Sequence, residues 1–383
     1  MKNWFRFSEW WDSKIAFLFG LVYLFAIHRS IDFRGSAVNV LFLLSWMCLA
    51  AALGYYINDV FDLKKDTATA KRNFSVHHSV YQKILICIIL IGMIYLTWYC
   101  LNENIVTLVL ITSQIILFLL YSIPVSRLKE MPIAGPICDS IYASVIPGVM
   151  VYLTIDNPQE ISWLCIVFGV WLFMAGIRNI ISHHIDDFTN DNISGTKTSA
   201  VALGKMKMKR LVNYIISPIE VGFFLAFLIL LQGSIAFVAV GFVIYVIWVF
   251  NRELIFVKAN RHNWSPEKQD AYNFIGGVLL NEFYENWFPL ICLMTLIWHN
   301  YILWPLLIVH IILFRSNIVE FGKDYLILKN LILAKAFWTS VSVGYSLAGI
   351  IKRWVCFLYY EIFGRIKHYI YWKIYIPLSG KDE

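Results

Sequence analysis

The sequence predicts an all-α fold, a multi-pass membrane bundle of about nine transmembrane helices around a central cavity. Of its 383 residues, 59% are hydrophobic and only 15% are charged, and the mean hydropathy is +0.65. Soluble domains carry roughly 25% charged residues, so the composition excludes an ordinary soluble protein. The apolar runs are continuous rather than alternating, and helices pair all their backbone groups inside a bilayer, whereas open sheets do not.

Nine apolar runs are long enough to cross the roughly 30 Å hydrocarbon core as helices of about 20 residues. In chain order they are 12–28, 37–57, 84–101, 105–122, 133–153, 161–182, 211–231, 234–251 and 279–298. A tenth run, 301–314, is short and could instead continue the ninth, broken near Pro305.

The two ends of the chain differ in character from the apolar core. Residues 1–11 are aromatic and mixed in charge and show no cleavage site, which indicates an interfacial lead-in to the first helix. We assign 1–315 to the membrane core and 316–383 to a basic C-terminal extension. This extension mixes Lys and Arg with aliphatic and aromatic residues and is typical of interfacial amphipathic helices, with an eleventh short span as the alternative.

Loop charges predict the orientation. The loops after the second, fourth, sixth and eighth runs contain sixteen Lys and Arg residues, whereas the alternate loops hold only Arg29 and Arg34. The positive-inside rule therefore places the first set in the cytoplasm, and a bacterial inner membrane is the expected location. The net charge of +7 follows from this topology and from attraction of anions, so it requires no nucleic-acid partner.

Two acidic motifs stand where long apolar runs end. In the first acidic motif (residues 58–66), Asp59, Asp62 and Asp66 follow the spacing i, i+3 and i+7, which is one face of a helix. In the second (residues 187–198), Asp187 and Asp191 are separated by four residues. Four apolar runs separate the motifs, so both lie on the same membrane face. This pattern indicates two four-helix halves, plus extra helices, that close around one cavity.

The oxygen ligands of these motifs favour a magnesium site. Like charges at helical spacing repel unless a cation lies among them, and hard carboxylate oxygens suit Mg²⁺, which binds carboxylates together with phosphate oxygens and water. The alternative is a solvated acidic helix end balanced by lysines, which explains one such cluster more readily than two on one face.

Basic residues accompany the acidic motifs, as an anionic substrate requires. The candidate diphosphate ligands are Asn58, Lys71, Arg72, Arg127, Lys129, Arg178 and Lys197. The positive-inside rule would place most of these cations in loops regardless. Arg178 is more telling because it lies within the sixth run, and an intramembrane Arg tends to face a cavity or a partner. Asp139, in the fifth run, is a candidate partner or a second lining residue.

These motifs together resemble the UbiA superfamily of intramembrane prenyltransferases. The resemblance rests on Asn-Asp-x-x-Asp-x-x-x-Asp at 58–66 with the Lys-Arg pair at 71–72, and on Asp-x-x-x-Asp-x-x-x-Gly-x-x-Thr at 187–198. The stretch 121–130 resembles a short motif that many members carry after their fourth helix. The likeness covers roughly residues 10–300. Asn73 departs from the proline that many relatives have, and the tail after about 315 lies outside the usual nine-helix core.

The resemblance implies a Mg²⁺-dependent prenyltransferase. Such enzymes bind a polyprenyl diphosphate, ionise its C–O bond and let an acceptor, most often an aromatic or quinone-precursor ring, capture the allylic cation. The resemblance further implies that one Mg²⁺ is held by Asn58, Asp59, Asp62 and Asp66, and the other by Asp187 and Asp191. These five aspartates are the implied catalytic residues, whereas Asp186 is adjacent but out of register. The partners implied are the prenyl diphosphate, a small-molecule or lipid acceptor, and the membrane lipids.

Three other functions share parts of this pattern. Relatives in the same superfamily transfer phosphoribose to a polyprenyl phosphate, and the sequence does not separate that activity from prenyl transfer. A cation-coupled transporter usually places its acids near the bilayer midplane, whereas these lie at the rim. A CDP-alcohol phosphotransferase needs Asp-x-x-Asp-Gly, but Leu63 follows Asp62.

A polar and aromatic stretch opens the ninth run and is a hypothesis for acceptor selection. It comprises Asn281, Glu282, Tyr284, Glu285 and Trp287. A solvated helix start is the simpler interpretation of the same residues.

Overall fold

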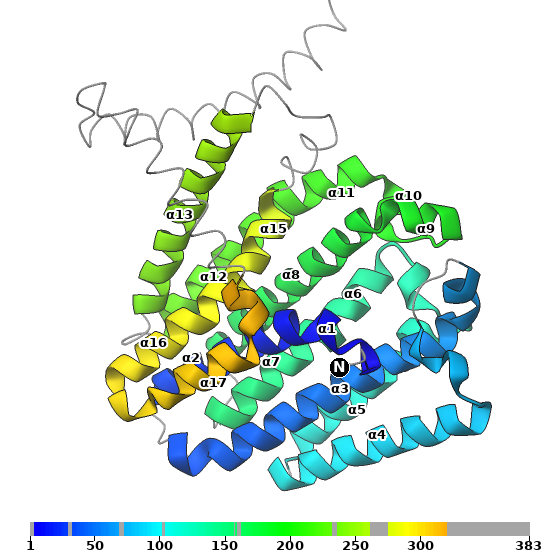
Figure 1. Ribbon diagram of the computed structural model, residues 1–383, viewed down its shortest axis with the longest axis horizontal. Coiled ribbons are helices and arrows are strands. Elements are labelled where there is room, and N and C mark those ends of the chain that lie inside the picture. Colours follow the sequence, from blue (N-terminus) through cyan, green and yellow to red (C-terminus); the bar gives the residue numbers. More distant parts are fainter. Residues whose placement is uncertain are drawn as a thin grey trace, which may run out of the picture. The chain divides into compact units, whose positions relative to one another are not determined.

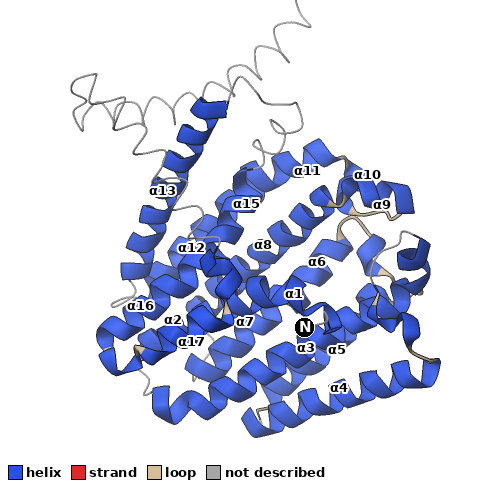
Figure 2. Cartoon of the chain, viewed as in Figure 1, coloured by secondary structure: helices blue, strands red, loops and turns tan. Residues whose placement is uncertain are grey.

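All the elements that the structure describes are helices (Figures 1 and 2), which confirms the all-α prediction. This computed structural model describes residues 4–29, 33–68, 73–101, 104–156, 158, 162–231, 236–260 and 275–319. They belong to one compact unit, Met1–Lys323. Lys71, Arg72 and the predicted extension beyond residue 319 lie outside the described residues, so the boundary at 315 stays a prediction.

Seven helical stretches in the described part are long and apolar enough to cross a membrane. They are Trp11–Arg29, Ala37–Leu63, Val80–Leu101, Ile105–Ser122, Ala134–Asp156, Trp163–Asp186 and Lys205–Leu231, and each overlaps one of the first seven predicted spans. Two shorter apolar helices, Ala236–Val249 and Tyr301–Leu313, overlap the predicted eighth and tenth runs. The ninth run is covered by three consecutive helical elements rather than one.

The helices of the first half begin with α2 (Ala16–Arg29), which follows the short elements η1 (Trp4–Arg6), α1 (Phe7–Trp10) and η2 (Trp11–Ile15). They continue with α3 (Phe33–Ala68), η3 (Phe74–His77), α4 (Val80–Leu101), α5 (Ile105–Ser122), η4 (Leu128–Glu130), α6 (Ala134–Ser140), η5 (Ile141–Val145), α7 (Ile146–Val151) and η6 (Tyr152–Asp156).

The second half begins with α8 (Trp163–Asp186), and the remaining elements are α9 (Phe188–Ser194), α10 (Ser199–Leu203), α11 (Lys205–Leu211), η7 (Val212–Ile216), α12 (Ser217–Leu231), α13 (Ala236–Asn260), α15 (Ile275–Glu282), η9 (Phe283–Trp287), α16 (Phe288–His299), η10 (Tyr301–Leu303) and α17 (Pro305–Leu313).

Helix α8 packs against α12, α3 against α4, and α2 against α16. Between α8 and α12 the buried rings of Phe168, Trp171 and Phe227 stack on one another, with centroids 4.9 to 5.8 Å apart. These rings bring a large buried contact area to this pair of helices.

Among the described residues, three of the five π-helical turns stand just before a proline inside a membrane helix. The turns η5, η7 and η9 precede Pro147, Pro218 and Pro289. Proline has no N–H to donate, so carbonyls one turn earlier need other partners. Two receive them from other helices: Gln114 Nε2 donates to the carbonyl of Tyr142 at 2.8 Å, and Asn317 Nδ2 donates to that of Glu285 at 3.1 Å. The first of these bonds lies in the wall of the cavity described next.

Candidate active site

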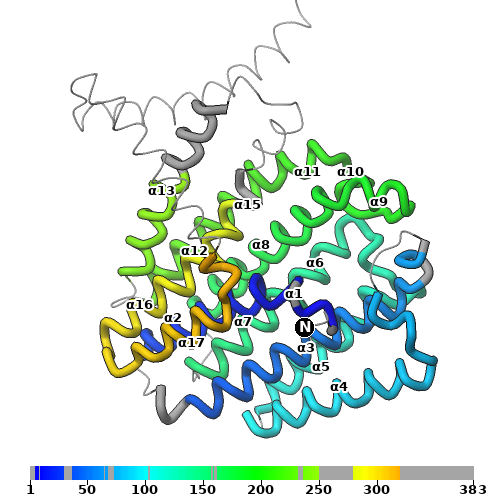
Figure 3. The backbone as a smooth tube through the Cα atoms, viewed as in Figure 1, coloured from blue at the N-terminus to red at the C-terminus, as the bar shows by residue number. Residues whose placement is uncertain are grey.

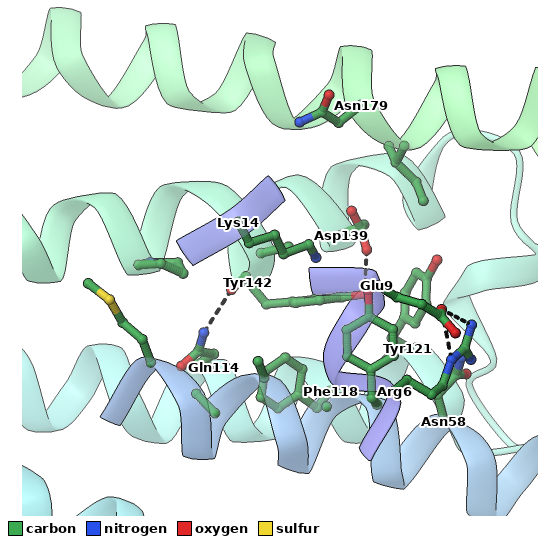
Figure 4. A pocket seen from close by; sticks show the side chains of 18 of the residues that line it. Arg6, Glu9, Lys14, Asn58, Gln114, Phe118, Tyr121, Asp139, Tyr142 and Asn179 are labelled. Atoms are coloured by element: carbon green, nitrogen blue, oxygen red, sulfur yellow. Dashed lines mark hydrogen bonds and ion pairs between the residues drawn. The ribbon is translucent and has the colours of Figure 1, made fainter. Parts of the chain in front are cut away.

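A cavity of about 530 Å³ lies among α3, α5, the α6–α7 stretch, α8 and the amino-terminal segment, which we define as Trp4–Ile15 (Figure 4). Its polar lining includes Arg6, Glu9, Lys14, Asn58, Ser122, Asp139, Asn179 and His183. Its apolar lining includes Ile15, Leu18, Trp46, Met47, Ala50, Phe118 and Pro147. On α3, Trp46 lies about 18 Å from Asn58 at the usual helical rise of about 1.5 Å per residue. The cavity therefore suits a ligand with a polar head and an apolar tail.

Asp59 is almost fully buried, at 1% exposure, where the chain after α3 folds back over the first acidic motif. Its Oδ2 accepts a hydrogen bond from the Phe74 N–H at 2.9 Å, and its backbone carbonyl accepts from Asn73 Nδ2 and Ser75 Oγ. Its Oδ1 is buried without a hydrogen bond and lies 3.5 Å from Arg6 Nη1. A buried carboxylate oxygen of this kind has capacity for a cation.

Two cations converge on Asp62. Arg127 Nη2 lies 3.0 Å from its Oδ1, and Lys129 Nζ lies 2.5 Å from its Oδ2. The same Lys129 ammonium donates to Asn58 Oδ1 at 2.7 Å. Burial lowers the pKa of Lys129 below its ordinary value, although the charge of Asp62 acts in the opposite direction. Asn58 and Asp62 of the first acidic motif thus form one charged cluster with Arg127 and Lys129 of the stretch 121–130.

Asn73 explains how the chain accommodates its departure from the family's proline. Its Nδ2 donates to Asp66 Oδ2 at 2.8 Å as well as to the Asp59 carbonyl, and its Oδ1 caps η3 by accepting from the Ser75 N–H. Proline could make none of these bonds. The asparagine side chain therefore ties the loop to two members of the first acidic motif.

The second acidic motif sits at a bend between α8 and α9. Asp187 is the last residue bonded to α8, through its N–H to the His183 carbonyl, and His183 Nε2 lies 3.5 Å from its Oδ2. Asp191 Oδ2 accepts from Thr198 Oγ1 at 3.0 Å. Gly195 ends α9 with φ of +69°, in the left-handed region that favours glycine. These bonds make the Asp-x-x-x-Asp-x-x-x-Gly-x-x-Thr pattern a folded loop.

Contacts between loops join the second acidic motif to the first. Lys65 Nζ, from α3, lies 2.5 Å from Glu130 Oε1 and 3.4 Å from Thr196 Oγ1. Burial opposes ionisation of Glu130, but hydrogen bonds from Lys65 and Arg127 outweigh it and lower the pKa of the carboxyl. In addition, Ser199 Oγ donates to the Pro132 carbonyl at 2.6 Å. The two motifs therefore lie at one end of the bundle, where Figure 1 shows α9 and α10 facing the loop that leads into α6.

Not every predicted site residue joins this cluster. Lys197 is exposed. Within the described residues, no group of three or more His, Cys, Asp or Glu side chains is close enough to hold a metal ion by itself. Asp59 and Asp62 instead face arginine and lysine side chains.

Arg178 has a different partner from the one expected. It is completely buried, and it pairs with Glu220 of α12, with nitrogen–oxygen distances of 2.7 and 3.1 Å. It also donates to Asn281 Oδ1, whereas the hydrogen bond found at Asp139 comes from the Tyr142 hydroxyl. Arg178 does not line the cavity. Glu220 rather than Asp139 is therefore the ion-pair partner of Arg178, whereas Asp139 lines the cavity, which is the other role expected of it. Because Arg178 does not line the cavity, we leave it out of the proposed diphosphate site.

We expect the loss of only one partner of this buried ion pair to destabilise the protein strongly. Replacing Glu220 by alanine leaves the Arg178 guanidinium buried and uncompensated, which should lower the free energy of unfolding by about 3–5 kcal/mol. The double variant Arg178→Met/Glu220→Leu should recover most of that loss. Chemical unfolding in detergent measures both changes, and a double variant as unstable as the single one would contradict this account.

The polar stretch of the ninth run does not line the cavity either. Asn281 contacts Arg178, and the Tyr284 hydroxyl accepts from Trp171 Nε1 at 3.0 Å inside the core. The hypothesis of acceptor selection by this stretch therefore has no support from its position, and its residues hold α8, α12 and α15 together.

Sequence reasoning missed several cavity residues. Arg6 and Glu9 come from the stretch interpreted as an interfacial lead-in, and Lys14 comes from the start of the first predicted span. Tyr142 belongs to an apolar run in which no single ring stands out, and Tyr121 opens the stretch 121–130, to which no ring role was assigned. The Tyr142 hydroxyl donates to Asp139, and the Tyr121 and Tyr142 rings lie 5.3 Å apart. The one sequence signal for the amino-terminal cavity residues is their charge, because three charged residues among aromatic ones are unusual beside a first membrane helix.

Known proteins with this architecture point to one family. The model of the UbiA prenyltransferase family matches residues 15–268. A UbiA homolog from Archaeoglobus fulgidus, solved with GPP and Mg²⁺, shares the fold with a TM-score of 0.54 at 18% identity, covering 77% of this chain and 98% of its own. Its complex with DMAPP and Mg²⁺ gives 0.51 at 18% identity, covering 74% and 96%.

A structure of digeranylgeranylglyceryl phosphate synthase gives a TM-score of 0.50 at 16% identity, covering 77% of this chain and 95% of its own. No curated protein matches the chain. At these identities the structural likeness is one of fold. The family match, however, spans both acidic motifs and the helices that carry them, and so the chain belongs to the UbiA prenyltransferase family.

Proposed function

We propose that this protein transfers a prenyl group from a prenyl diphosphate to an acceptor, with Mg²⁺ as cofactor and with release of diphosphate. The observation that carries the proposal is that the Lys65–Thr196 contact joins the two acidic motifs beside the polar end of a cavity, which Asn58 and His183 line and whose other end is apolar. A diphosphate head fits the charged end and an isoprenoid tail fits the apolar end. The A. fulgidus homolog, which binds GPP and DMAPP with Mg²⁺, supports this assignment.

The residues present fit the cofactor in their chemistry. In the proposal, Asn58, Asp59, Asp62 and Asp66 hold one Mg²⁺, and Asp187 and Asp191 hold the other. The buried Asp59 Oδ1, which has no hydrogen bond, is consistent with a place at a cation. When bound, the metal supplies positive charge that stabilises the leaving diphosphate.

The remaining steps belong to the protein's own side chains. Arg127 and Lys129, which now neutralise Asp62, would be available to donate to diphosphate oxygens once a metal ion takes that carboxylate. The apolar walls exclude water from the allylic cation, and the ring faces of Phe118 and Tyr121 can stabilise its charge. We propose an aromatic or quinone-precursor ring as the acceptor and a cytoplasm-facing site, from the family resemblance and the loop charges respectively.

Purified protein with geranyl diphosphate tests the proposal directly. Binding that requires Mg²⁺ and disappears with a chelator, together with slow release of diphosphate, is the expected result. Folded protein that binds neither geranyl nor longer prenyl diphosphates would contradict it.

The lowered pKa of Lys129 predicts how this binding depends on pH. Lys129 attracts an anion only while it is protonated, and burial makes it lose its proton at a lower pH than an ordinary lysine does. Affinity for diphosphate should therefore fall as the pH rises, and the fall should begin at a lower pH than the roughly 10.4 at which an ordinary lysine titrates. In Lys129→Arg the side chain stays charged, so the decline should be absent. Equal pH profiles in the two proteins, measured by equilibrium binding, would remove Lys129 from the site.

A further inference from the structure

Four residues of the amino-terminal segment, Arg6, Glu9, Lys14 and Ile15, line the cavity, and contacts at several points hold the segment there. Figure 3 shows its backbone in dark blue, from the N label through α1. The Phe5 ring packs on those of Tyr56 and Phe74, with centroids 5.8 and 4.9 Å apart. At the other end of the segment, Trp11 Nε1 donates to the Leu313 carbonyl at 2.7 Å, and Asn317 donates to the Asp12 carbonyl. The segment thus bridges the first acidic motif and the end of α17.

The backbone of the amino-terminal segment adopts an unusual conformation at Phe5 and Arg6. Phe5 and Arg6 have φ of +51° and +54°, in the left-handed region that residues with a side chain seldom adopt. The Trp10 indole N–H secures this turn by donating to the Phe5 carbonyl at 3.0 Å. The turn brings the Arg6 side chain to the cavity wall, where Figure 4 shows it beside Glu9 and Asn58.

Two positive charges result at the polar end of the cavity. Arg6 Nη1 lies 3.5 Å from Asp59 Oδ1, and its Nε donates to Glu9 at 2.9 Å. The Arg6 guanidinium and the Lys14 ammonium both lie over the Tyr55 ring, 5.1 and 5.8 Å from its centroid. Lys14 has no carboxylate within ion-pair distance among the described residues. A cation that lines a membrane cavity without a counter-charge favours an anionic ligand.

Arg6 and a metal ion bound by Asp59 would repel each other unless an anion lay between them. Asp59 is a proposed ligand of Mg²⁺, and Arg6 now provides the positive charge beside its Oδ1. A divalent cation at the same carboxylate would repel the guanidinium. A diphosphate placed between the two cations turns that repulsion into attraction, because arginine forks readily onto phosphate oxygens.

We propose that Arg6 is a diphosphate-binding residue that the amino-terminal segment delivers to the active site. On this view the segment covers the cavity mouth, and Arg6 exchanges Asp59 for diphosphate oxygens when Mg²⁺ and substrate bind. Lys14 adds a second positive charge at the same mouth. The inference rests on the proposed function, since it assigns a further residue to the same substrate.

Equilibrium binding of two probes, Mg²⁺ with inorganic diphosphate and Mg²⁺ with geranyl diphosphate, tests this role. Arg6→Ala should weaken both by about 10–100-fold, the range expected for lost charge-assisted hydrogen bonds. Arg6→Lys should recover part of the affinity, because it restores the charge but not the forked geometry. Arg210→Ala, which removes an exposed arginine of α11, is the matched control and should bind as the wild type does. Amide hydrogen exchange within residues 4–15 should slow when Mg²⁺ and inorganic diphosphate are added to the wild type.

Three results would overturn the proposal. Unchanged affinity of Arg6→Ala for both probes would show that Arg6 does not contact the head group. Weaker binding of geranyl diphosphate alone would make the segment a wall for the prenyl tail. Tighter binding of both probes would make Arg6 a competitor for Asp59. Wild-type protein that binds neither probe would instead refute the proposed function, which separates the two failures.

Discussion

Replacing Asp62 by asparagine is expected to lower Mg²⁺-dependent release of diphosphate from geranyl diphosphate by about 10³-fold, the scale of losing a charge that stabilises a transition state. Asp62 has the most central place in the charged cluster, because it contacts Arg127 and Lys129 and shares Lys129 with Asn58. The amide keeps the shape of the side chain but removes the negative charge that a metal ion needs.

The same change should also destabilise the protein, and the two effects can be separated. Lys129 is 9% exposed and would lose its carboxylate partner, which should cost about 1.5–3 kcal/mol. In the double variant Asp62→Asn/Lys129→Met the unpaired cation is gone, so stability in detergent should return while diphosphate release stays lost. A double variant that regains both stability and diphosphate release would show that Asp62 acts only as a counter-charge for Lys129, and the proposed metal role of Asp62 would be wrong.

The helices could be predicted because their signal is local. Each of the first seven spans is a continuous apolar run, and the bilayer leaves helices as the one solution for such runs. The first acidic motif could be read in the same way, since its spacing follows a helix that continues beyond the apolar run to Ala68. The bend at Asp187 and the left-handed Gly195 also follow from a short local pattern.

Partners between helices could not be predicted. Arg178 pairs with Glu220, which lies 42 positions later, and the choice depends on how α8 packs against α12. The same holds for Asn73, whose amide satisfies two residues of the preceding helix only because the loop folds back. The amino-terminal segment is the clearest case. Its aromatic residues are equally suited to a membrane interface and to a cavity mouth, and only the contacts with Tyr56, Phe74 and Leu313 decide between them.

Adjacent aspartates at the end of α8 offer a paired test of the second acidic motif. Asp187 is at the bend, 3.5 Å from the His183 ring that lines the cavity, and it is 27% exposed. Asp186 is one position out of register and exposed, and its charge interacts with His183 and with Lys205 and Lys209 of α11. A helix rotates by about 100° per residue, so the two neighbouring side chains point in different directions.

We therefore expect Asp187→Asn to reduce diphosphate release by about 10²–10³-fold. Asp186→Asn should change it by less than about fivefold, because exposed ion pairs contribute at most about 1 kcal/mol. Raising the Mg²⁺ concentration should recover part of the activity of Asp187→Asn and none in Asp186→Asn, since only the first variant loses a proposed metal ligand. Steady-state release measured across a Mg²⁺ titration distinguishes the two. Equal losses in both variants would mean that the end of α8 contributes only general negative charge, and the assignment of a second metal ion to Asp187 and Asp191 would then fail.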